Sequence, residues 1–260
     1  MVAQPVVLVL CYHGISDRWP EPTAVRPERL EEQLTMLVDR GYRGATFTEA
    51  LTAPPASRTV VVTFDDAPQS IAKLALPIMG KLGLPGTVFV PTSFPDNGRP
   101  MAWSGQEDWI GTEYERELAC MSWAELRELA DRGWEIGSHT RSHPRLTALG
   151  DGPLQEELRG SRADCEENLG RPCRSLAYPY SDFDAGVVRA AREAGYLLAG
   201  IVAGKPVAPL PLQWPRVLVS RRDTARRLAI RIWRRQSLTG SPLARGVDAA
   251  LRSARRVFAR

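Results

Sequence analysis

The sequence predicts an α/β protein in which short buried strands alternate with amphipathic helices. Three observations support this fold class: β-branched runs recur along the chain, stretches of helical periodicity separate them, and no internal repeat is visible. The 260 residues are 43% hydrophobic and 25% charged, which is typical of a globular protein with a full core. We expect one α/β domain, because α/β barrels commonly use about 250 residues as a single unit.

The individual elements follow from local pattern. Apolar, β-branched runs predict strands over 6–12, 59–64, 86–90, 134–137, 175–178, 197–202 and 213–219. Helical periodicity predicts helices over 27–40, 123–132, 154–168 and 183–194, and an amphipathic basic stretch after 224. Gly41 ends the first of these helices, and Ser122 with Glu125 forms a capping-box pattern before the second.

The segment 93–120 interrupts this alternation. It is rich in proline, glycine and aromatic residues and has no clear period. A loop this long within a compact domain is typical of a lid or a binding loop. Trp103, Trp109 and Tyr114 could stack on sugar rings or could tether the loop to the body of the protein, and the sequence leaves both interpretations open.

Positive charge is concentrated at the C-terminal end of the chain. Residues 216–260 contain 13 arginines, two aspartates and no lysine or glutamate, a net charge of +11. Because the whole chain carries +4, residues 1–215 carry −7. We divide the chain into a domain over 1–236 and a basic tail over 237–260. Leu228, Ile232 and Trp233 give the basic stretch an apolar side, which favours either docking on an anionic membrane or a helix that covers the barrel and a solvated end. We expect no nucleic-acid partner.

The N-terminal end predicts the location of the protein. Its apolar run is too short to cross a bilayer and no basic region precedes it, so we expect neither a membrane span nor a signal peptide. The four cysteines form no Cys-x-x-Cys pair, which favours reduced thiols. We therefore expect a cytoplasmic protein, with the inner membrane surface as the place of any peripheral docking.

Two adjacent acids, Asp65 and Asp66, follow the buried strand 59–64. Active sites of α/β sheets and barrels lie at the C-terminal ends of strands. Neighbouring acids can take separate roles there, one binding a metal and the other transferring protons. A turn or a helix N-cap would use the same residue type, so the pair alone leaves both interpretations open.

Two of the three histidines, His139 and His143, lie four residues apart just after the strand 134–137. Two imidazoles at this spacing can bind one cation, and with Asp66 they would supply three protein ligands and leave a position for water. Histidines satisfied within the core or exposed at the surface are the alternative.

Two weaker signals end other predicted strands. Tyr178-Pro179-Tyr180-Ser181 forms a proline-fixed turn that could direct a backbone N–H into a site. His13, the remaining histidine, follows the strand 6–12, where it could also simply cap a loop.

Together these segments resemble the polysaccharide deacetylase family, also called the NodB-homology domain or carbohydrate esterase family 4. Thr63-Phe64-Asp65-Asp66 is similar to the first family motif, and His139-Thr140-Arg141-Ser142-His143 is similar to the second. Ala177-Tyr178-Pro179-Tyr180 is similar to a variant of the third, with Ser181 where glycine is usual. The resemblance extends to about residue 223.

The resemblance implies a single distorted (β/α) barrel, to which we add the basic helical tail. It also implies a bound divalent metal, which we expect to be Zn²⁺, with Co²⁺ or Ni²⁺ as alternatives. The implied ligands are Asp66, His139 and His143. Asp65 is implied as general base, and the Tyr180 backbone N–H as a donor to the oxyanion. We expect Pro179 and Trp103 to contact the substrate.

The general acid is implied by a circular permutation. The common family order ends with a histidine motif, but no histidine follows His143 in this chain. Biofilm poly-N-acetylglucosamine deacetylases carry that histidine on the first strand, and Leu10-Cys11-Tyr12-His13 resembles this arrangement. His13 is therefore the candidate acid, while the carboxylate that would orient it is not identified.

The resemblance implies a metal-dependent N-deacetylase that acts on N-acetylhexosamine units of a glycan or a glycan precursor. A hydrolase of O-acetyl sugars or of cyclic amides is the enzymatic alternative. The non-enzymatic alternative is a catalytically silent module that binds glycan or docks on a membrane. Arg141 or Arg216 could hold Asp65 ionised, but we expect both to be solvated.

Overall fold

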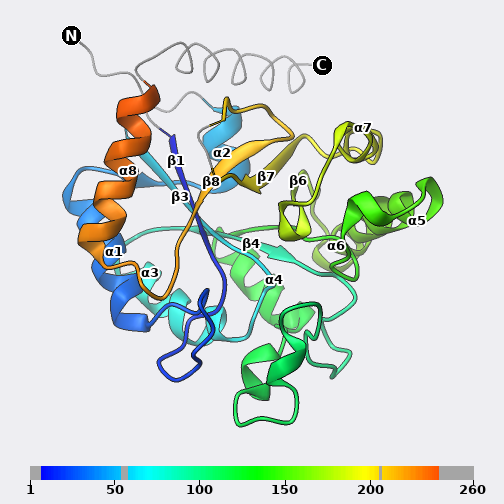
Figure 1. The fold of residues 1–260 in the computed structure, drawn as a ribbon, viewed down its shortest axis with the longest axis horizontal. Helices are drawn as coiled ribbons and strands as arrows, with labels where there is room; N and C mark the ends of the chain where they lie inside the picture. Colours follow the sequence, from blue (N-terminus) through cyan, green and yellow to red (C-terminus); the bar gives the residue numbers. More distant parts are fainter. Residues whose placement is uncertain (1–6, 54–57, 205–206, 240–260) are drawn as a thin grey trace.

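Seven parallel strands close into a barrel in the computed structural model (Figure 1). The structure describes residues 7–53, 58–204 and 207–239, and in α8 it describes the side chains as far as residue 234. The strands are β1 (Val7–Tyr12), β3 (Thr59–Phe64), β4 (Gly86–Val90), β5 (Glu135–Ser138), β6 (Ser175–Ala177), β7 (Leu198–Val202) and β8 (Trp214–Leu218). Their order around the barrel is β1-β8-β7-β6-β5-β4-β3, and β1 pairs with β3 to close it. The two-residue strand β2 (Arg43–Gly44) pairs with β3 outside the ring. The barrel fold is confirmed, as are the seven strands to within one or two residues at each end.

Helices cover the outside of the barrel. They are α1 (Pro27–Asp39), α2 (Phe47–Thr52), α3 (Leu76–Lys81), α4 (Trp123–Asp131), α5 (Asp151–Gln155), α6 (Ser161–Leu169), α7 (Ala185–Glu193) and α8 (Ala225–Thr239). Single π-helical turns over Ile71–Ala75 and Glu156–Gly160 lead into α3 and join α5 to α6. The helix predicted over 154–168 thus begins three residues earlier, at Asp151. No described helix is both long enough and apolar enough to cross a membrane.

The barrel interior follows from the two-residue period of the strands. Val9 and Val61 belong to an inner cluster, while their chain neighbours pack outward against the helices. Helix α2 closes the N-terminal end, where Phe47 meets Phe89 edge to face with ring centroids 5.6 Å apart. By the same alternation Cys11, Thr63 and Asp65 face inward at the C-terminal end. The strands therefore deliver one acid of the Asp-Asp pair to the interior.

The segment 93–120 resolves into two short 3₁₀ helices, Glu107–Trp109 and Glu115–Leu118, beside the C-terminal rim. Trp109 contacts Trp19 and Tyr114 edge to face, and its Nε1 donates to Glu21 at 3.2 Å. For Trp109 and Tyr114 the tethering interpretation therefore holds. Trp103 lies elsewhere, against the candidate site described below.

Helix α8 packs against α1 and buries Leu228 and Ile232. Trp233, the third apolar residue of the predicted amphipathic stretch, does not share this buried side, because its side chain is 67% exposed. The proposed boundary near residue 236 falls within α8, and residues 240–260 lie outside the described residues. The division into domain and tail therefore stays a prediction.

Candidate metal centre and catalytic site

Asp66, His139 and His143 form one compact cluster at the C-terminal ends of β3 and β5. Asp66 Oδ1 lies 3.4 Å from His139 Nε2 and 3.5 Å from His143 Nε2. All three residues are buried, and one ligand atom from each lies within 4.8 Å of the others. The three residues predicted as metal ligands are thus brought together.

The donor set fits a divalent cation. Nitrogen and oxygen ligands arranged tetrahedrally around Zn²⁺ lie about 3.4 Å apart, close to both separations. Asp66 Oδ1 is buried and makes no hydrogen bond among the described residues, which is costly unless a cation neutralises it. His139 Nδ1 lies 2.8 Å from the Ala177 carbonyl oxygen, an arrangement that fixes the ring and directs Nε2 toward Asp66.

Burial and neighbouring charges have opposing effects on the pKa values of Asp66 and His139. Burial alone would raise the pKa of Asp66, but the two imidazoles hold it below its ordinary value. Burial opposes a charge on His139, yet Asp66 and Asp65 raise its pKa above the ordinary value. Burial and the neighbouring His139 lower the pKa of His143 to about 3, so its ring is neutral at physiological pH. A neutral imidazole is the form that binds metal.

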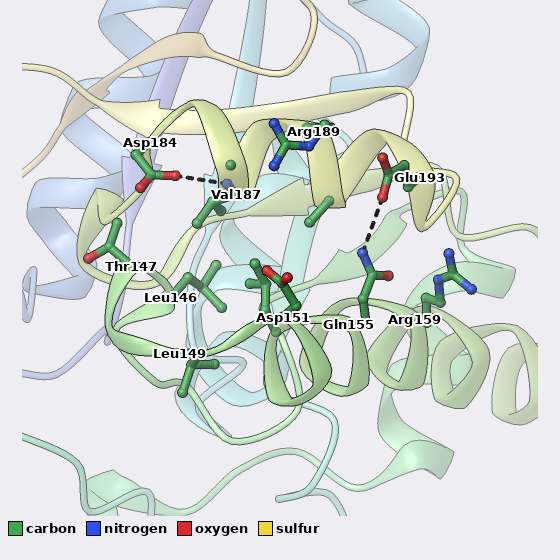
Figure 2. Close-up of a pocket in the computed structure, with 13 residues that line it drawn as sticks. Leu146, Thr147, Leu149, Asp151, Gln155, Arg159, Asp184, Val187, Arg189 and Glu193 are labelled. Carbon is green, nitrogen blue, oxygen red and sulfur yellow. Dashed lines mark hydrogen bonds between the residues drawn. The ribbon is translucent and has the colours of Figure 1, made fainter.

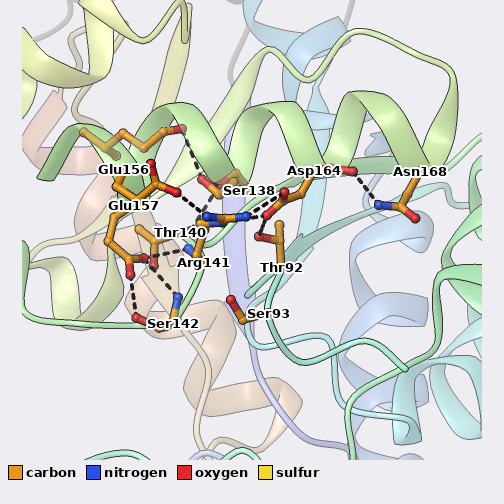
Figure 3. A network of polar contacts seen from close by, with 12 residues as sticks. Thr92, Ser93, Ser138, Thr140, Arg141, Ser142, Glu156, Glu157, Asp164 and Asn168 are labelled. Atoms are coloured by element: carbon orange, nitrogen blue, oxygen red, sulfur yellow. Dashed lines mark hydrogen bonds and ion pairs between the residues drawn. The ribbon is translucent and has the colours of Figure 1, made fainter. Parts of the chain in front are cut away.

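A polar network holds the loop between the two histidines (Figure 3). Arg141 pairs with Asp164 at 2.9 Å and with Glu156. Glu157 accepts from the backbone N–H groups of Arg141 and Ser142 at 2.8 and 3.0 Å. Arg141 therefore supports the histidine loop and does not contact Asp65.

Several non-glycine residues of the site adopt left-handed backbone conformations. The φ angles are 70° at Asp66, 67° at Thr140, 61° at His143 and 56° at Tyr180. Such conformations cost of order 1–3 kcal/mol each and occur where the surrounding structure imposes them. The strain coincides with the loops that carry the chemical groups.

Asp65 is held by a buried arginine from β8. Its two carboxylate oxygens accept from Arg216 at 2.6 and 2.8 Å, and the Cys11 thiol lies 3.4 Å from Oδ2. Burial alone would raise the pKa of Asp65, but the Arg216 charge and hydrogen bonds lower it far below its ordinary value. The expectation that Arg216 is solvated is wrong, since it is 1% exposed. Burial of its planar group is compensated by the bidentate pair.

Gly200 on β7 makes room for this arginine. A Cβ atom there would lie 2.7 Å from Arg216 Nε and 2.8 Å from Cδ. We expect Gly200→Ala to displace the guanidinium from Asp65 and to lower the free energy of unfolding by about 1–3 kcal/mol through overpacking.

Urea unfolding would measure this effect, with Gly80→Ala in α3 as the matched control, because no atom lies within 4 Å of a Cβ at that position. The control should be neutral or slightly stabilising. Equal effects of the two substitutions would contradict the close packing of Arg216.

His13 lies at the end of β1, beside Cys11 and Asp65. One donor atom from each of these three residues lies within 4.8 Å of the others. Asp65 is therefore a carboxylate close to His13, but His13 Nδ1 has no hydrogen-bond partner among the described residues, so the carboxylate that would orient the ring stays unidentified. His13, Asp66 and Trp103 line a small cavity with about 10 Å³ of free volume, roughly that of one water molecule.

Aromatic rings enclose His143. The Trp103 ring stacks on its imidazole with centroids 3.9 Å apart, and Tyr180 contacts it edge to face at 4.6 Å. The Arg145 guanidinium lies over the Tyr180 ring, with its Cζ 4.4 Å from the ring centroid. Trp103 thus packs directly on a candidate ligand, and its predicted contact with substrate stays a prediction.

The turn after β6 carries Pro179 and Tyr180 to the same rim. Pro179 is buried, and Tyr180 is 37% exposed beside His143. Ser181, where the family usually has glycine, has a φ of 52° in the left-handed region. Its hydroxyl accepts from the Val202 backbone N–H at 2.7 Å, which anchors the turn to β7.

A second, larger pocket lies apart from this cluster (Figure 2). Its volume is about 460 Å³, and it lies between α7 and the helix that begins with α5. Asp184, Arg189 and Glu193 line one wall, and Asp151, Gln155 and Arg159 line the other. Gln155 Nε2 spans the pocket to Glu193 Oε2 at 3.5 Å. None of the predicted site residues lines it.

Sequence reasoning missed three contributors to the site. Cys11 faces Asp65 from β1, Gln106 lines the small cavity, and Arg145 covers Tyr180. The two-residue period of the first strand could have identified Cys11 as inward-facing. No local signal marks Gln106 or Arg145.

The fold and the site together define a (β/α) barrel protein with a carboxylate–imidazole cluster that could hold a cation, next to an acid that an arginine holds. The family model for polysaccharide deacetylase matches residues 52–199, and the chain belongs to that family. It is the NodB-homology, carbohydrate esterase family 4 group that the motifs resemble.

Curated relatives are similar over much of the chain. YxkH of Bacillus subtilis, which carries the name polysaccharide deacetylase, is 26% identical over 72% of this chain and 61% of its own length. The poly-β-1,6-N-acetyl-D-glucosamine N-deacetylase of Staphylococcus aureus is 25% identical over 68% of this chain and 59% of its own length. The chain therefore spans about three fifths of the length of these relatives.

Solved structures share the fold. The deacetylase PplD of Streptococcus pyogenes, solved with acetate, superposes with a TM-score of 0.72 at 21% identity and covers 87% of this chain and 98% of its own. IcaB from Ammonifex degensii superposes with a TM-score of 0.69 at 24% identity, covering 88% and 97%. Both support the architecture of the barrel.

Proposed function

We propose that this protein is a metal-dependent N-deacetylase that hydrolyses the acetamido group of N-acetylhexosamine units in a glycan or glycan precursor. The observation that carries the proposal is the buried Asp66–His139–His143 cluster beside the ionised Asp65. Membership of the polysaccharide deacetylase family supports the reaction class. The name of the Staphylococcus aureus relative supports an N-acetylated glucosamine polymer as the substrate class.

Asp66, His139 and His143 would hold the cation, for which we propose Zn²⁺ because two imidazoles and a carboxylate suit it. Co²⁺ and Ni²⁺ are the alternatives for the same donor set. When bound, the cation supplies Lewis acidity, which lowers the pKa of a water molecule and polarises an acetyl carbonyl.

Asp65 would accept the proton that water loses as it attacks the carbonyl carbon. Arg216 keeps this carboxylate ionised at neutral pH, so it is ready to accept a hydrogen bond from the water. This pairing also lowers the basicity of Asp65, so the proposed role depends on the cation lowering the pKa of the attacking water.

The developing oxyanion and the departing nitrogen need their own donors. The Tyr180 backbone N–H would donate to the oxyanion, a contribution typically worth about 3 kcal/mol in the transition state. His13 would donate a proton to the amide nitrogen as the C–N bond breaks, releasing acetate and a free amine. Trp103 and Pro179, at the same rim, would contact the sugar.

Turnover of an N-acetylated chitooligosaccharide, measured with and without a chelator, tests the proposal. We expect acetate release that the chelator abolishes and that added Zn²⁺, Co²⁺ or Ni²⁺ restores. Release from O-acetyl sugars alone, or opening of a cyclic amide alone, would assign the alternative hydrolase. Binding of the oligosaccharide with no turnover under any metal would assign a silent module.

His13→Ala should separate amide from ester substrates. Loss of the general acid should lower amide turnover by about 10²–10⁴-fold, since an amine leaves poorly without a proton. An activated acetyl ester has a good leaving group and should be much less affected. Parallel assays on both substrates, with metal content as the control, check this; equal losses would exclude His13 as the acid.

A further inference from the structure

The outer face of α8 carries an exposed apolar group that the barrel does not use. Trp233 is 67% exposed and Ile230 is 41% exposed, and Trp233 is the most exposed large hydrophobic side chain among the described residues. The two are three residues apart and share one side of the helix. The opposite side, with Leu228 and Ile232, is buried against the barrel. The helix is therefore apolar on two sides, and the core uses one of them.

These side chains form part of a groove between α8 and α1. Its volume is about 470 Å³, and its lining consists of Met36, Arg40, Ala225, Arg226, Ala229, Ile230 and Trp233. The lining contains no acidic residue. The groove is thus lined by apolar side chains and two arginines.

Arginines surround this face with little compensation. Arg226 and Arg234 are exposed and form no ion pair with any described residue. Among the α8 side chains that the structure describes, Arg231 is the arginine with an ion pair, to Asp223 at 2.7 Å. The sequence of α8 contains five arginines and no acid. A partner that satisfies this face must offer many negative charges at its edge and apolar material at its centre.

We propose that the outer face of α8 docks the protein on an anionic lipid bilayer. Phosphate headgroups would pair with Arg226 and Arg234, while Ile230 and Trp233 would enter the boundary between headgroups and acyl chains. A helix with a basic polar side and tryptophan and aliphatic side chains between is typical of interfacial membrane binding. Tryptophan in particular prefers the headgroup level.

The charge distribution of the whole chain favours the same orientation. Residues 216–260 carry +11 and residues 1–215 carry −7. An anionic surface attracts the arginine-rich part and repels the acidic part. Among the described residues, α8 supplies five arginines and no acid to this attraction. A nucleic acid would also attract the arginines, but its phosphates offer no apolar layer for Ile230 and Trp233. The lipid surface is therefore the partner that matches both parts of the face.

Sedimentation of the full chain with vesicles tests the proposal. We expect binding to phosphatidylcholine vesicles that contain phosphatidylglycerol, weak binding to phosphatidylcholine alone, and release by salt. The double substitution Ile230→Ser with Trp233→Ser should raise the lipid concentration for half-binding by about tenfold or more, because two apolar side chains no longer leave water. Arg226→Glu with Arg234→Glu should raise it by a similar factor.

Matched controls separate this face from general exposure and charge. Val207→Ser with Leu210→Ser removes side chains that are 41% and 49% exposed elsewhere and should leave binding unchanged. Arg99→Glu with Arg116→Glu makes the same charge change within the segment 93–120, away from α8, and should have a smaller effect. Circular dichroism melts and turnover of a soluble substrate verify that each variant is folded.

A fluorescent label provides a second measurement that does not depend on affinity. An environment-sensitive dye on Ile230→Cys should shift to the blue with anionic vesicles, whereas the dye on Leu210→Cys should not. Unchanged binding by the Ile230/Trp233 variant, or no shift at residue 230, would overturn the proposal and assign any binding to charge alone. Duplex DNA binding that needs Arg226 and Arg234, in a protein that vesicles do not retain, would overturn it in favour of a nucleic-acid surface.

Discussion

His139→Ala is expected to leave the protein folded but with little bound divalent metal. The substitution removes one of three candidate ligands. In this cluster Asp66 Oδ1 lies 3.4 Å from His139 Nε2 and 3.5 Å from His143 Nε2. Loss of groups that only support a ligand already costs about 10–100-fold in metal affinity, so loss of the ligand itself should cost more. Elemental analysis after dialysis and titration calorimetry with Zn²⁺ measure the effect.

Asp65→Asn is the matched control for this prediction. Its side chain has nearly the same volume and lies next to Asp66 in the sequence, but Arg216 and not the cation cluster holds it. We expect metal content near that of the unaltered protein and a fall in turnover of about 10²-fold or more. Metal loss in both variants, or in neither, would contradict the separation of roles between the adjacent acids.

Arg216→Met is expected to produce the largest loss of stability. Asp65 is 3% exposed, and the substitution leaves its carboxylate inside the barrel without the Arg216 guanidinium that compensates its charge. Removal of one partner of a buried ion pair costs about 3–5 kcal/mol, mostly because the other charge is left uncompensated. The double substitution Asp65→Asn with Arg216→Met should therefore be more stable than Arg216→Met alone.

The pH dependence of this loss has a defined sign. In the unaltered protein Arg216 lowers the pKa of Asp65, so the pair stabilises the fold above about pH 4 and loses this contribution only in stronger acid. Without Arg216, burial raises the pKa of Asp65, and the acid takes up a proton at higher pH. The deficit of Arg216→Met should therefore grow from pH 5 to pH 8 in urea unfolding; a deficit independent of pH would contradict it.

Local pattern was sufficient for the seven barrel strands and for the Asp66–His139–His143 cluster. Each strand is a buried β-branched run, and the residues predicted as ligands follow strands directly, so the barrel brings them to one rim. Helix α2 was not predicted, because six residues are too few for a helical period to be recognised. Thr46 and Glu49 form a capping box that could have indicated it.

Contacts between residues that are far apart in the chain could not be predicted from the sequence. Arg216 and Asp65 are 151 residues apart, and only barrel closure places one beside the other. Trp103 and Trp109 occur in the same loop, yet one packs on His143 and the other on Trp19. The composition of the loop could not distinguish these two packing positions, because each depends on which part of the folded protein the ring contacts.

The position of β1 has a consequence for how the chain acquires its structure during synthesis. This N-terminal strand lies between β3 and β8, in register with Thr59–Phe64 on one side and with Val217 and Leu218 on the other. The first pairing is available once β3 has emerged, but the second must wait for β8, more than 150 residues later. Because contacts between distant segments form late and limit folding rates, ring closure should be the slow step. Arg216 arrives with the closing strand, so Asp65 of a nascent chain stays without its arginine partner until the barrel has closed.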